Sequence, residues 1–407
     1  MDVDIRPIAA DELEAYLAAL EVAFSSRLED EDLERERSVA APERYLAAFD
    51  AGSIISGAAS APKQITLPGD RIATTAFVTA VGVQATHRRR GINTALMRYQ
   101  LDELHERGEA FATLFASEGG IYGRFGYGLA SMLGEVDVQT DRSAFVPGYE
   151  PSGHIEFLER EAALPAMRPI YDTARRRRPG MLDLDETWFA WRWWLRSRDR
   201  DSPLFHAIHR DQRGEADGYV VYTVNHEWPD SIPHLQLEIR ELIATTPGAF
   251  ADLWRFVFDV DLVRRVKAWN RPVDEPLPWM MAEPRQLKTR VVDALWVRLV
   301  DVPAASALRG YAAAGRVTIG VEDHFCPWNE GTFSLEVDEG GNGSCASTEQ
   351  EPDLVSRVND LGATFLGGST FAQLAAAGHV QELVPGSVAR ADQMFGHGPA
   401  PWCSFIL

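Results

Sequence analysis

Between residues 77 and 115, the pattern of hydrophobic and polar positions changes from that of a strand to that of a helix and back. The run Phe77–Val83 is apolar and β-branched, which is typical of a buried strand. After Gly91 the apolar residues fall on two stripes at helical spacing, which predicts a helix to about Arg107 that is buried on two sides, with Gly108 as its stop. Phe111–Phe115 predicts a second strand. The sequence therefore predicts a strand–turn–helix–strand unit.

The turn inside this unit is basic and consists of His87-Arg88-Arg89-Arg90-Gly91. The first N–H groups of a helix have no intrahelical partner, and together with the helix dipole they favour an anion. Gly91 has no Cβ, so a phosphate can approach the backbone there, and the arginines add positive charge. The turn therefore predicts a pyrophosphate site, as for a nucleotide or coenzyme A. A solvated basic turn is the alternative, and the flanking strand and helix argue against it.

The segments before this unit predict further strands and a helix. Val3–Ile8 is expected to form a first strand, and Asp11 to cap a helix that runs to Phe24. Two strands of a meander are expected at 44–51 and 53–67. Strands followed by a strand–turn–helix–strand unit indicate an α+β sheet domain that ends near residue 135.

A second region follows a linker rich in Pro and Gly. Residues from Ile155 to about Trp194 are expected to be helical, and Trp and Arg alternate near the end of this helix. In an acidic chain that cluster indicates packing rather than stacking on nucleic-acid bases. Three strands and a helix are then expected at 204–209, 218–225, 235–244 and 247–259. This order repeats that of the first region without its basic turn, so we expect no coenzyme site here.

A third region begins with a strand expected at Val291–Leu299. The elements expected after it are a helix at 303–313, strands at 316–322 and 331–337, a helix at 353–361, a strand at 363–365 and a helix at 369–377. The last nine residues, Pro399–Leu407, are apolar, which is unusual for a terminus and predicts that this tail is buried.

Length and composition indicate a globular protein of two or three domains, with 407 residues of which 45% are apolar. The net charge of −20 argues against nucleic-acid binding. It would attract cationic small molecules such as polyamines, or it serves solubility alone. The acidic start contains no targeting segment, and we expect no membrane span. Three widely spaced cysteines predict a reducing cytoplasm and no metal site.

Two motifs resemble a known enzyme family. Arg88-x-x-Gly91-x-Asn93 resembles the Arg/Gln-x-x-Gly-x-Gly/Ala motif of the GNAT acetyltransferases, with Asn93 as a departure. The string S-E-G-G-I-Y-G-R-F-G-Y-G from Ser117 to Gly128, together with the basic turn, resembles the Eis (enhanced intracellular survival) family of multi-acetylating aminoglycoside N-acetyltransferases from actinobacteria. The resemblance implies acetyl-coenzyme A as co-substrate, no metal and a homohexamer.

The resemblance also implies an architecture. It predicts an α+β protein with two tandem GNAT-like domains followed by a sterol-carrier-protein-like domain. The expected segments are 1–135 for the catalytic GNAT domain, 136–287 for a second GNAT-like domain without a coenzyme site, and 288–407 for the sterol-carrier-like domain.

Coenzyme binding is assigned partly by chemistry and partly by the resemblance. The backbone of Val81, Gly82 and Val83 can pair with the pantetheine amides as an added strand would, and Gly82 would help that strand to bulge. A backbone N–H of Val81 or Val83 would face the thioester oxygen. The resemblance adds Ser117 and Glu118. The full set of expected coenzyme-binding residues is Val81, Gly82, Val83, Arg88, Arg89, Arg90, Gly91, Ile92, Asn93, Thr94, Ser117 and Glu118.

Acetyl transfer to an amine also needs an acid and a base. The pKa of tyrosine is near that of a thiol, so a tyrosine can protonate the leaving thiolate. Tyr122 and Tyr127 are candidates, and the resemblance selects Tyr122 and leaves Tyr127 to the core. It also implies that the base is the terminal carboxylate, here that of Leu407. The alternatives are Glu118 as base, or a terminus that is docked only for stability.

The sequence thus predicts a cytoplasmic N-acetyltransferase acting on primary amines. The resemblance implies aminoglycosides at several positions, by direct transfer in a ternary complex. The rival hypotheses are an acetyltransferase for protein lysines or polyamines, and a non-enzymatic sensor that binds acyl-coenzyme A or lipid without consuming it.

Overall fold

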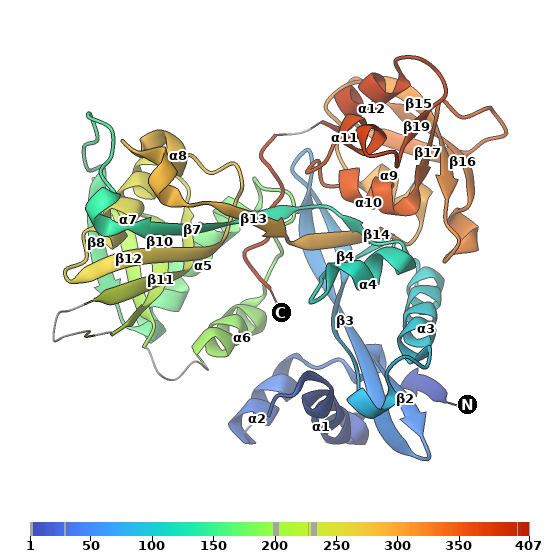
Figure 1. Ribbon diagram of the computed structural model, residues 1–407, viewed down its shortest axis with the longest axis horizontal. Coiled ribbons are helices and arrows are strands. Elements are labelled where there is room, and N and C mark those ends of the chain that lie inside the picture. Colours follow the sequence, from blue (N-terminus) through green and yellow to red (C-terminus); the bar gives the residue numbers. More distant parts are fainter. Residues whose placement is uncertain are drawn as a thin grey trace. The chain divides into compact units, whose positions relative to one another are not determined.

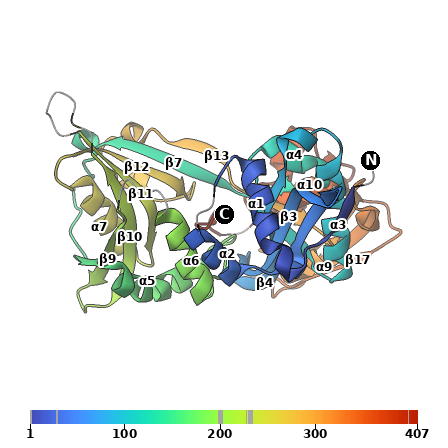
Figure 2. The same cartoon turned by 90° about the horizontal axis from the view of Figure 1, so that it is seen from below.

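The computed structural model describes residues 3–27, 30–197, 203–226, 228, 234–396 and 398–406, with only the backbone described at 30–32, 35 and 194–197. These residues form two compact units, shown in Figures 1 and 2. Unit 1 comprises Met1–Ser131, Ala294–Pro401 and Ile406–Leu407, and unit 2 comprises Met132–Asp293 and Trp402–Phe405. Helices and strands mix in both units, which confirms the α+β class.

The first sheet of unit 1 has seven strands in the order β1-β2-β3-β4-β5-β14-β6. Helices α1 and α3 cover opposite faces of it, because Ala47 packs against α1 while its neighbours Leu46 and Ala48 pack against α3. The strands are β1 (Asp4–Pro7), β2 (Tyr45–Asp50), β3 (Ser53–Leu67), β4 (Arg71–Val83), β5 (Phe111–Phe115), β14 (Leu295–Leu299) and β6 (Gly128–Leu129). The helices are α1 (Leu13–Phe24), α2 (Asp30–Val39), α3 (Ile92–Glu106) and α4 (Gly119–Tyr122).

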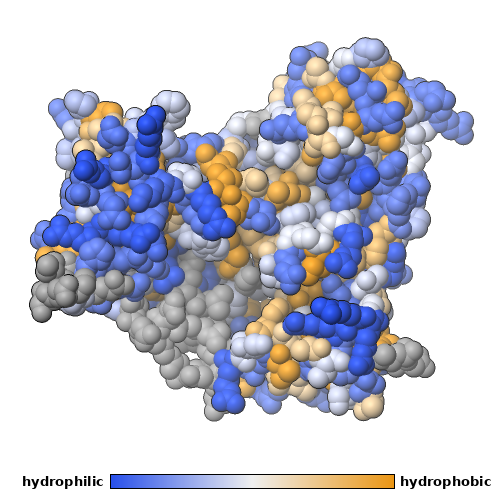
Figure 3. Space-filling model, in the orientation of Figure 1, coloured by the Kyte–Doolittle hydropathy of each residue, from blue (hydrophilic) through white to orange (hydrophobic). Residues whose placement is uncertain are grey.

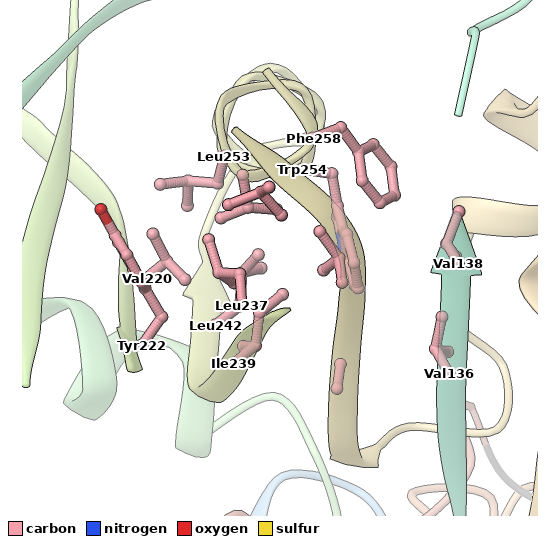
Figure 4. Packing of buried hydrophobic residues seen from close by; sticks show 14 of the residues in the cluster. Val136, Val138, Val220, Tyr222, Leu237, Ile239, Leu242, Leu253, Trp254 and Phe258 are labelled. Atoms are coloured by element: carbon pink, nitrogen blue, oxygen red, sulfur yellow. The ribbon is translucent and has the colours of Figure 1, made fainter. Parts of the chain in front are cut away.

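Unit 2 is built on a sheet in the order β13-β7-β12-β11-β10-β9-β8. Figure 4 shows Leu253, Trp254 and Phe258 of α7 packed over this sheet. The strands are β7 (Met132–Gln139), β8 (Gly153–Leu158), β9 (Phe205–Asp211), β10 (Ala216–Asn225), β11 (Leu235–Ala244), β12 (Val263–Arg271) and β13 (Arg290–Asp293). The helices are α5 (Arg160–Arg175), α6 (Glu186–Ser197), α7 (Pro247–Phe258) and α8 (Leu277–Met280).

The two sheets share one plan. In each, an antiparallel meander leads into a strand, a helix and a parallel strand: β4, α3 and β5 in unit 1, and β11, α7 and β12 in unit 2. The predicted strand–turn–helix–strand unit of the first region is therefore confirmed, and so is the order of three strands and a helix in the second region, to which the structure adds the parallel strand β12.

The third region of the chain forms a five-stranded sheet in unit 1, in the order β17-β16-β15-β18-β19. Its strands are β15 (Gly315–Glu322), β16 (Gly331–Val337), β17 (Gly343–Ser347), β18 (Leu354–Arg357) and β19 (Gln381–Glu382). Its helices are α9 (Val302–Leu308), α10 (Val358–Thr364), α11 (Phe371–Ala376) and α12 (Ser387–Phe395).

Several predicted elements differ from the structure. Asp11 lies within a 3-10 turn, Ala10–Glu12, and it is the Glu12 carboxylate that accepts the N–H of Ala9, at 2.8 Å. The helix expected from Ile155 to about Trp194 is two helices, because α5 ends at Arg175 and α6 begins at Glu186. It also begins only at Arg160, because the preceding residues pair with β9 as an edge strand. A short apolar run is compatible with either a strand or a helix, so the ends of elements are difficult to predict from the sequence.

Further differences lie in the third region. The strand expected at Val291–Leu299 is two strands, because β13 joins the sheet of unit 2 and β14 joins that of unit 1. The helix expected at 353–361 begins as β18, which pairs with β15, and the strand expected at 363–365 is the end of α10. Since each sheet takes a strand from a distant part of the chain, the two units do not follow the segments 1–135, 136–287 and 288–407, whose boundaries stay predictions.

The surface is mainly polar. Figure 3 shows hydrophilic residues spread over the visible face, with smaller hydrophobic patches among them. Within the described ranges, no helix is long and apolar enough to cross a membrane.

Candidate functional site

The site in unit 1 begins where two parallel strands separate. β4 and β5 pair only at Ala76–Ala112 and Phe77–Thr113, after which β4 continues without β5. The register between β4 and β3 shifts between Thr79 and Gly82, and Ala80 in this stretch has a left-handed φ of 55°. An alanine rarely adopts that conformation, and the bulge turns the strand at the mouth of the opening.

The bulge was predicted at Gly82, but the left-handed residue is Ala80. Gly82 serves a different purpose. A Cβ on Gly82 would lie 3.1 Å from the Phe24 ring and 3.2 Å from the Ala23 Cβ, so the missing side chain lets the end of α1 lie against β4. Phe24 thereby reaches the opening between the strands.

The basic turn leads into the N-terminus of α3. Gly91 is the N-cap residue with a φ of 81°, and no side chain caps this helix. A Cβ on Gly91 would meet no atom within 4 Å, so the space in front of the helix is open. An uncapped helix start, open space and flanking arginines are features that favour an anion.

The three arginines of the turn differ in their surroundings. The Arg88 side chain donates from Nε to the Val83 carbonyl oxygen at 3.1 Å and from a terminal nitrogen to the Ala23 carbonyl oxygen at 3.2 Å. Arg88 therefore ties the end of β4 to the end of α1. Arg89 has a left-handed φ of 62°, and the side chains of Arg89 and Arg90 are exposed.

A cavity of about 740 Å³ collects most of the predicted coenzyme residues. Of the expected set, all but Arg90 line it. Residues outside the expected set also line it: His87 of the basic turn, and Ala23, Phe24, Ser25, Ile121 and Arg124. Ala23, Phe24 and Ser25, at the end of α1, belong to no sequence motif. They reach the cavity because the end of α1 lies against β4.

A second cavity, of about 270 Å³, shares Phe24, Val81 and Ser117 with the first. It extends along β4 from Phe77 to Val81, and Tyr122 lines it while the other candidate acid does not. Burial, and secondarily the charge of Glu118, raises the pKa of Tyr122. Its phenol therefore keeps its proton at neutral pH, as a general acid requires.

Tyr127 lies in the core beneath Tyr122. The two rings meet edge to face with centroids 5.9 Å apart, and Tyr127 is fully buried. Its hydroxyl has no hydrogen-bond partner among the described residues, and burial raises its pKa strongly. Tyr127 is thus a packing residue here.

Two glycines of the Ser117–Gly128 string serve packing within unit 1. A Cβ on Gly128 would lie 1.8 Å from the Asn359 carbonyl oxygen on α10, and one on Gly126 would lie 2.5 Å from the Arg298 guanidinium. The Asn359 amide also donates to the carbonyl oxygens of Gly123 and Tyr127, at 2.6 and 3.0 Å. Asn359, which no sequence motif marked, therefore fixes the turn that carries Tyr122.

The predicted base, Leu407, lies outside the described residues. The residues before it are buried as expected: Trp402, Cys403, Ser404 and Phe405 are each at most 5% exposed, and Ile406 is half-buried. The other candidate base, Glu118, is exposed and lines the larger cavity only. The described residues contain no group of three or more His, Cys, Asp or Glu side chains that could hold a metal ion.

This arrangement suits acetyl-coenzyme A. The open, uncapped helix start fits the pyrophosphate, and the unpaired edge of β4 beyond Phe77 fits the pantetheine amides. The buried Oδ1 of Asn93, which has no hydrogen-bond partner among the described residues, offers an acceptor at the helix start.

Comparisons with known proteins agree with this geometry. Models of an acetyltransferase (GNAT) domain match residues 4–130 and 180–299, and a sterol carrier protein domain matches 302–404. An uncharacterized N-acetyltransferase of Streptomyces avermitilis is 37% identical, with 99% of each chain covered. N-acetyltransferase Eis of Mycobacterium tuberculosis is 32% identical over 82% of this chain and 80% of that protein.

The crystal structure of Eis1 from Mycobacterium abscessus superposes with a TM-score of 0.86 at 32% identity, covering 99% of this chain and 100% of that one. The GNAT fold implies acetyl-coenzyme A as co-substrate. With two GNAT folds, a sterol-carrier-like domain and relatives of this similarity over nearly their whole lengths, the chain belongs to the Eis family of GNAT N-acetyltransferases and is an N-acetyltransferase.

Proposed function

We propose that the protein transfers acetyl groups from acetyl-coenzyme A to the primary amines of aminoglycosides, at several positions, by direct transfer in a ternary complex. The observation that carries this proposal is the pair of cavities that meet at Phe24, Val81 and Ser117. The larger one contains the basic turn and the smaller one ends at Tyr122. Neither is lined by a cysteine, so the lining offers no thiol for a covalent acetyl-enzyme and favours direct attack by the amine.

Each group has one task in this proposal. The co-substrate supplies an acetyl group activated as a thioester. The backbone N–H of Val81 is the better oxyanion donor, since Val81 lines both cavities while Val83 lines only the larger one. Tyr122, kept protonated by burial, gives its proton to the sulfur of the leaving group.

The terminal carboxylate of Leu407 removes the proton from the amine. Burial of Trp402–Phe405 supports this role, because it fixes the chain up to two residues before the terminus. A carboxylate is a weak base toward an ammonium group, so the amine must enter with a lowered pKa or through a water molecule. Glu118 is less suited, since it is exposed and does not line the smaller cavity.

The acceptor is proposed to be polycationic. The net charge of −20 favours encounter with such amines. The sequence Ser25–Arg37 is rich in Asp and Glu and overlaps helix α2 (Asp30–Val39). It would serve either to collect amines or only to solvate the surface. Homohexamer formation and a cytoplasmic location complete the proposal.

Product analysis by mass spectrometry tests the proposal. Acetyl-coenzyme A is supplied with an aminoglycoside, a polyamine or a lysine-containing protein, and acetyl groups are counted on each. The proposal predicts an aminoglycoside that carries two or more acetyl groups. Modification of one protein lysine with little product on free amines would favour the protein-lysine hypothesis, and bound but unconsumed acetyl-coenzyme A would favour the sensor.

A further inference from the structure

The second GNAT fold contains its own separating strand pair. β11 and β12 run parallel from Leu235–Val263 to Ile239–Ala268 and then part, as β4 and β5 do in unit 1. Along the chain, helix α7 follows β11 as α3 follows β4. Helix α5 comes between β8 and β9, the first two strands of unit 2's meander, as α1 comes between β1 and β2. Unit 2 therefore has the framework of a coenzyme cleft.

Within that framework, the protein's own contacts take up backbone groups that a coenzyme would otherwise bind. The Thr246 hydroxyl accepts the N–H of Ala249 at 3.1 Å and so caps α7, and Pro247 at the first helical position has no N–H. Across the strand gap, the Arg271 guanidinium donates to the Leu242 carbonyl oxygen at 2.8 Å. The anion site and part of the free strand edge are thus satisfied by the protein itself.

The C-terminal tail lies in this framework instead, beside α6 in Figure 1. The Trp402 N–H donates to the carbonyl oxygen of Pro179, in the segment after α5, at 2.9 Å. A Cβ on Gly180 would lie 3.0 Å from the Trp402 carbonyl oxygen, so the tail passes directly over that glycine. Trp402 also lines a cavity of about 330 Å³ together with Leu242 and Arg271, at the parted ends of the strands.

The side-chain amide of Asn270, at the end of β12, makes two hydrogen bonds to the tail. Its Nδ2 donates to the Cys403 carbonyl oxygen at 2.9 Å, and its Oδ1 accepts the indole N–H of Trp402 at 2.8 Å. Asn270 is 6% exposed and has a left-handed φ of 58°, at a break in the pairing of β12 with β7 between Ala268 and Arg271. Strained backbone persists only where surrounding contacts hold it, and here those contacts are with the tail.

Aromatic packing holds the next part of the tail. The Phe405 ring meets Trp188 and Trp191 of α6 edge to face, with centroids 6.1 and 6.3 Å apart. The thiol of Cys403 donates to the Phe405 carbonyl oxygen at 3.1 Å, and burial raises the pKa of that thiol to about 12. The thiol therefore stays protonated, and the tail has a defined conformation up to Phe405.

We propose that the parted strand pair of the second GNAT fold has become a clamp for the C-terminal tail, and that Asn270 is the positioning residue that sets where the terminal carboxylate lies. The catalytic part of this inference rests on the proposed function, in which that carboxylate is the base. The clamp itself does not depend on it.

The test compares Asn270→Gly with Leu262→Gly. Glycine at 270 accepts the left-handed backbone but removes both hydrogen bonds to the tail. Leu262 also has a left-handed φ, of 66°, and is exposed in the same unit, so it controls for the added glycine. Trp402→Phe, which removes only the indole donor, is a milder second variant. Cooperative thermal melting confirms that each chain is folded.

Two readouts separate the clamp from catalysis. Carboxypeptidase digestion of the folded protein, followed by intact mass, is expected to remove the tail at least about tenfold faster in Asn270→Gly than in the wild type and Leu262→Gly. In the same variant kcat should fall about 10- to 100-fold while acetyl-coenzyme A binding is unchanged, because a misplaced catalytic group loses its proximity advantage.

Equal digestion of Asn270→Gly and the wild type would overturn the clamp. Faster digestion with an unchanged kcat would keep the clamp, overturn the positioning role and remove the terminal carboxylate from the proposed mechanism. Lost activity with unchanged digestion would also overturn the positioning role, since the tail would then have stayed in place.

Discussion

Tyr122 and Tyr127 form a matched pair on which the assignment of the general acid can be tested. They lie five residues apart with their rings in contact, but only Tyr122 lines the smaller cavity. Replacing either with Phe removes one hydroxyl oxygen and keeps the ring, so packing changes little in both variants.

The expected effects are large and differ in kind. Loss of a general acid costs about 10²–10⁴-fold in kcat, which is about 3 to 5.5 kcal/mol of transition-state stabilisation for Tyr122→Phe. Tyr127→Phe should leave kcat within about twofold of the wild type. Tyr127→Phe removes a buried hydroxyl that has no partner among the described residues. The free energy of unfolding should therefore stay unchanged or rise by up to about 3 kcal/mol.

Steady-state coenzyme A release as a function of pH gives the kinetic result, and urea unfolding gives the stability. A general acid acts while protonated, and the pKa of Tyr122 is raised above 10, so its activity persists through neutral pH and falls only as the pH passes that raised value. This alkaline limb should disappear in Tyr122→Phe. Equal loss of kcat in both variants, or full activity of Tyr122→Phe, would refute the assignment.

Three further predictions concern stability. Gly128→Ala should lose about 3 kcal/mol or more in urea unfolding, because its Cβ would lie 1.8 Å from the Asn359 carbonyl oxygen; a loss below about 1 kcal/mol would contradict the packing described. Arg298→Met should cost about 3 to 5 kcal/mol, since it leaves the buried Asp323 carboxylate without its cation at 2.7 Å, and Arg298→Met combined with Asp323→Leu should recover most of that loss. Hydrogen bonds from Arg6 and then from the Ala9 N–H lower the pKa of Glu12 from 4.5 to about 2, so its stabilising contribution is complete above about pH 4.5 and is lost as the pH falls toward 2. Glu12→Gln should therefore flatten acid unfolding in that window, and an unchanged pH profile would show that the pair with Arg6 contributes nothing.

The strand–turn–helix–strand segment could be predicted from the sequence because each of its elements is specified by residues close together in the chain. The run from Phe77 to Phe115 contains a buried strand, a glycine turn and an amphipathic helix, and each has its own pattern. The structure reproduces them as β4, α3 and β5.

What could not be predicted depends on partners distant in the chain. β13 and β14 form one apolar run in the sequence, but β13 pairs with β7 in the sheet of unit 2 and β14 pairs with β5 and β6 in the sheet of unit 1. The motif placed Arg88 at the phosphates, whereas its side chain donates to two carbonyl oxygens, one of them at the end of α1. Gly126 and Gly128 matched a family motif. The reason that glycine is needed there is the close approach of Arg298 and of helix α10, which lie more than 150 residues later in the chain.

The most direct test of the proposed mechanism measures coenzyme A release with aminoglycosides on the native chain and on a chain extended by a few residues after Leu407. The extension moves the terminal carboxylate and leaves the cavity residues of unit 1 unchanged. The mechanism predicts that turnover collapses in the extended chain while acetyl-coenzyme A binding is retained. Equal turnover in the two chains would contradict it and would move Glu118 or a water chain into the role of base.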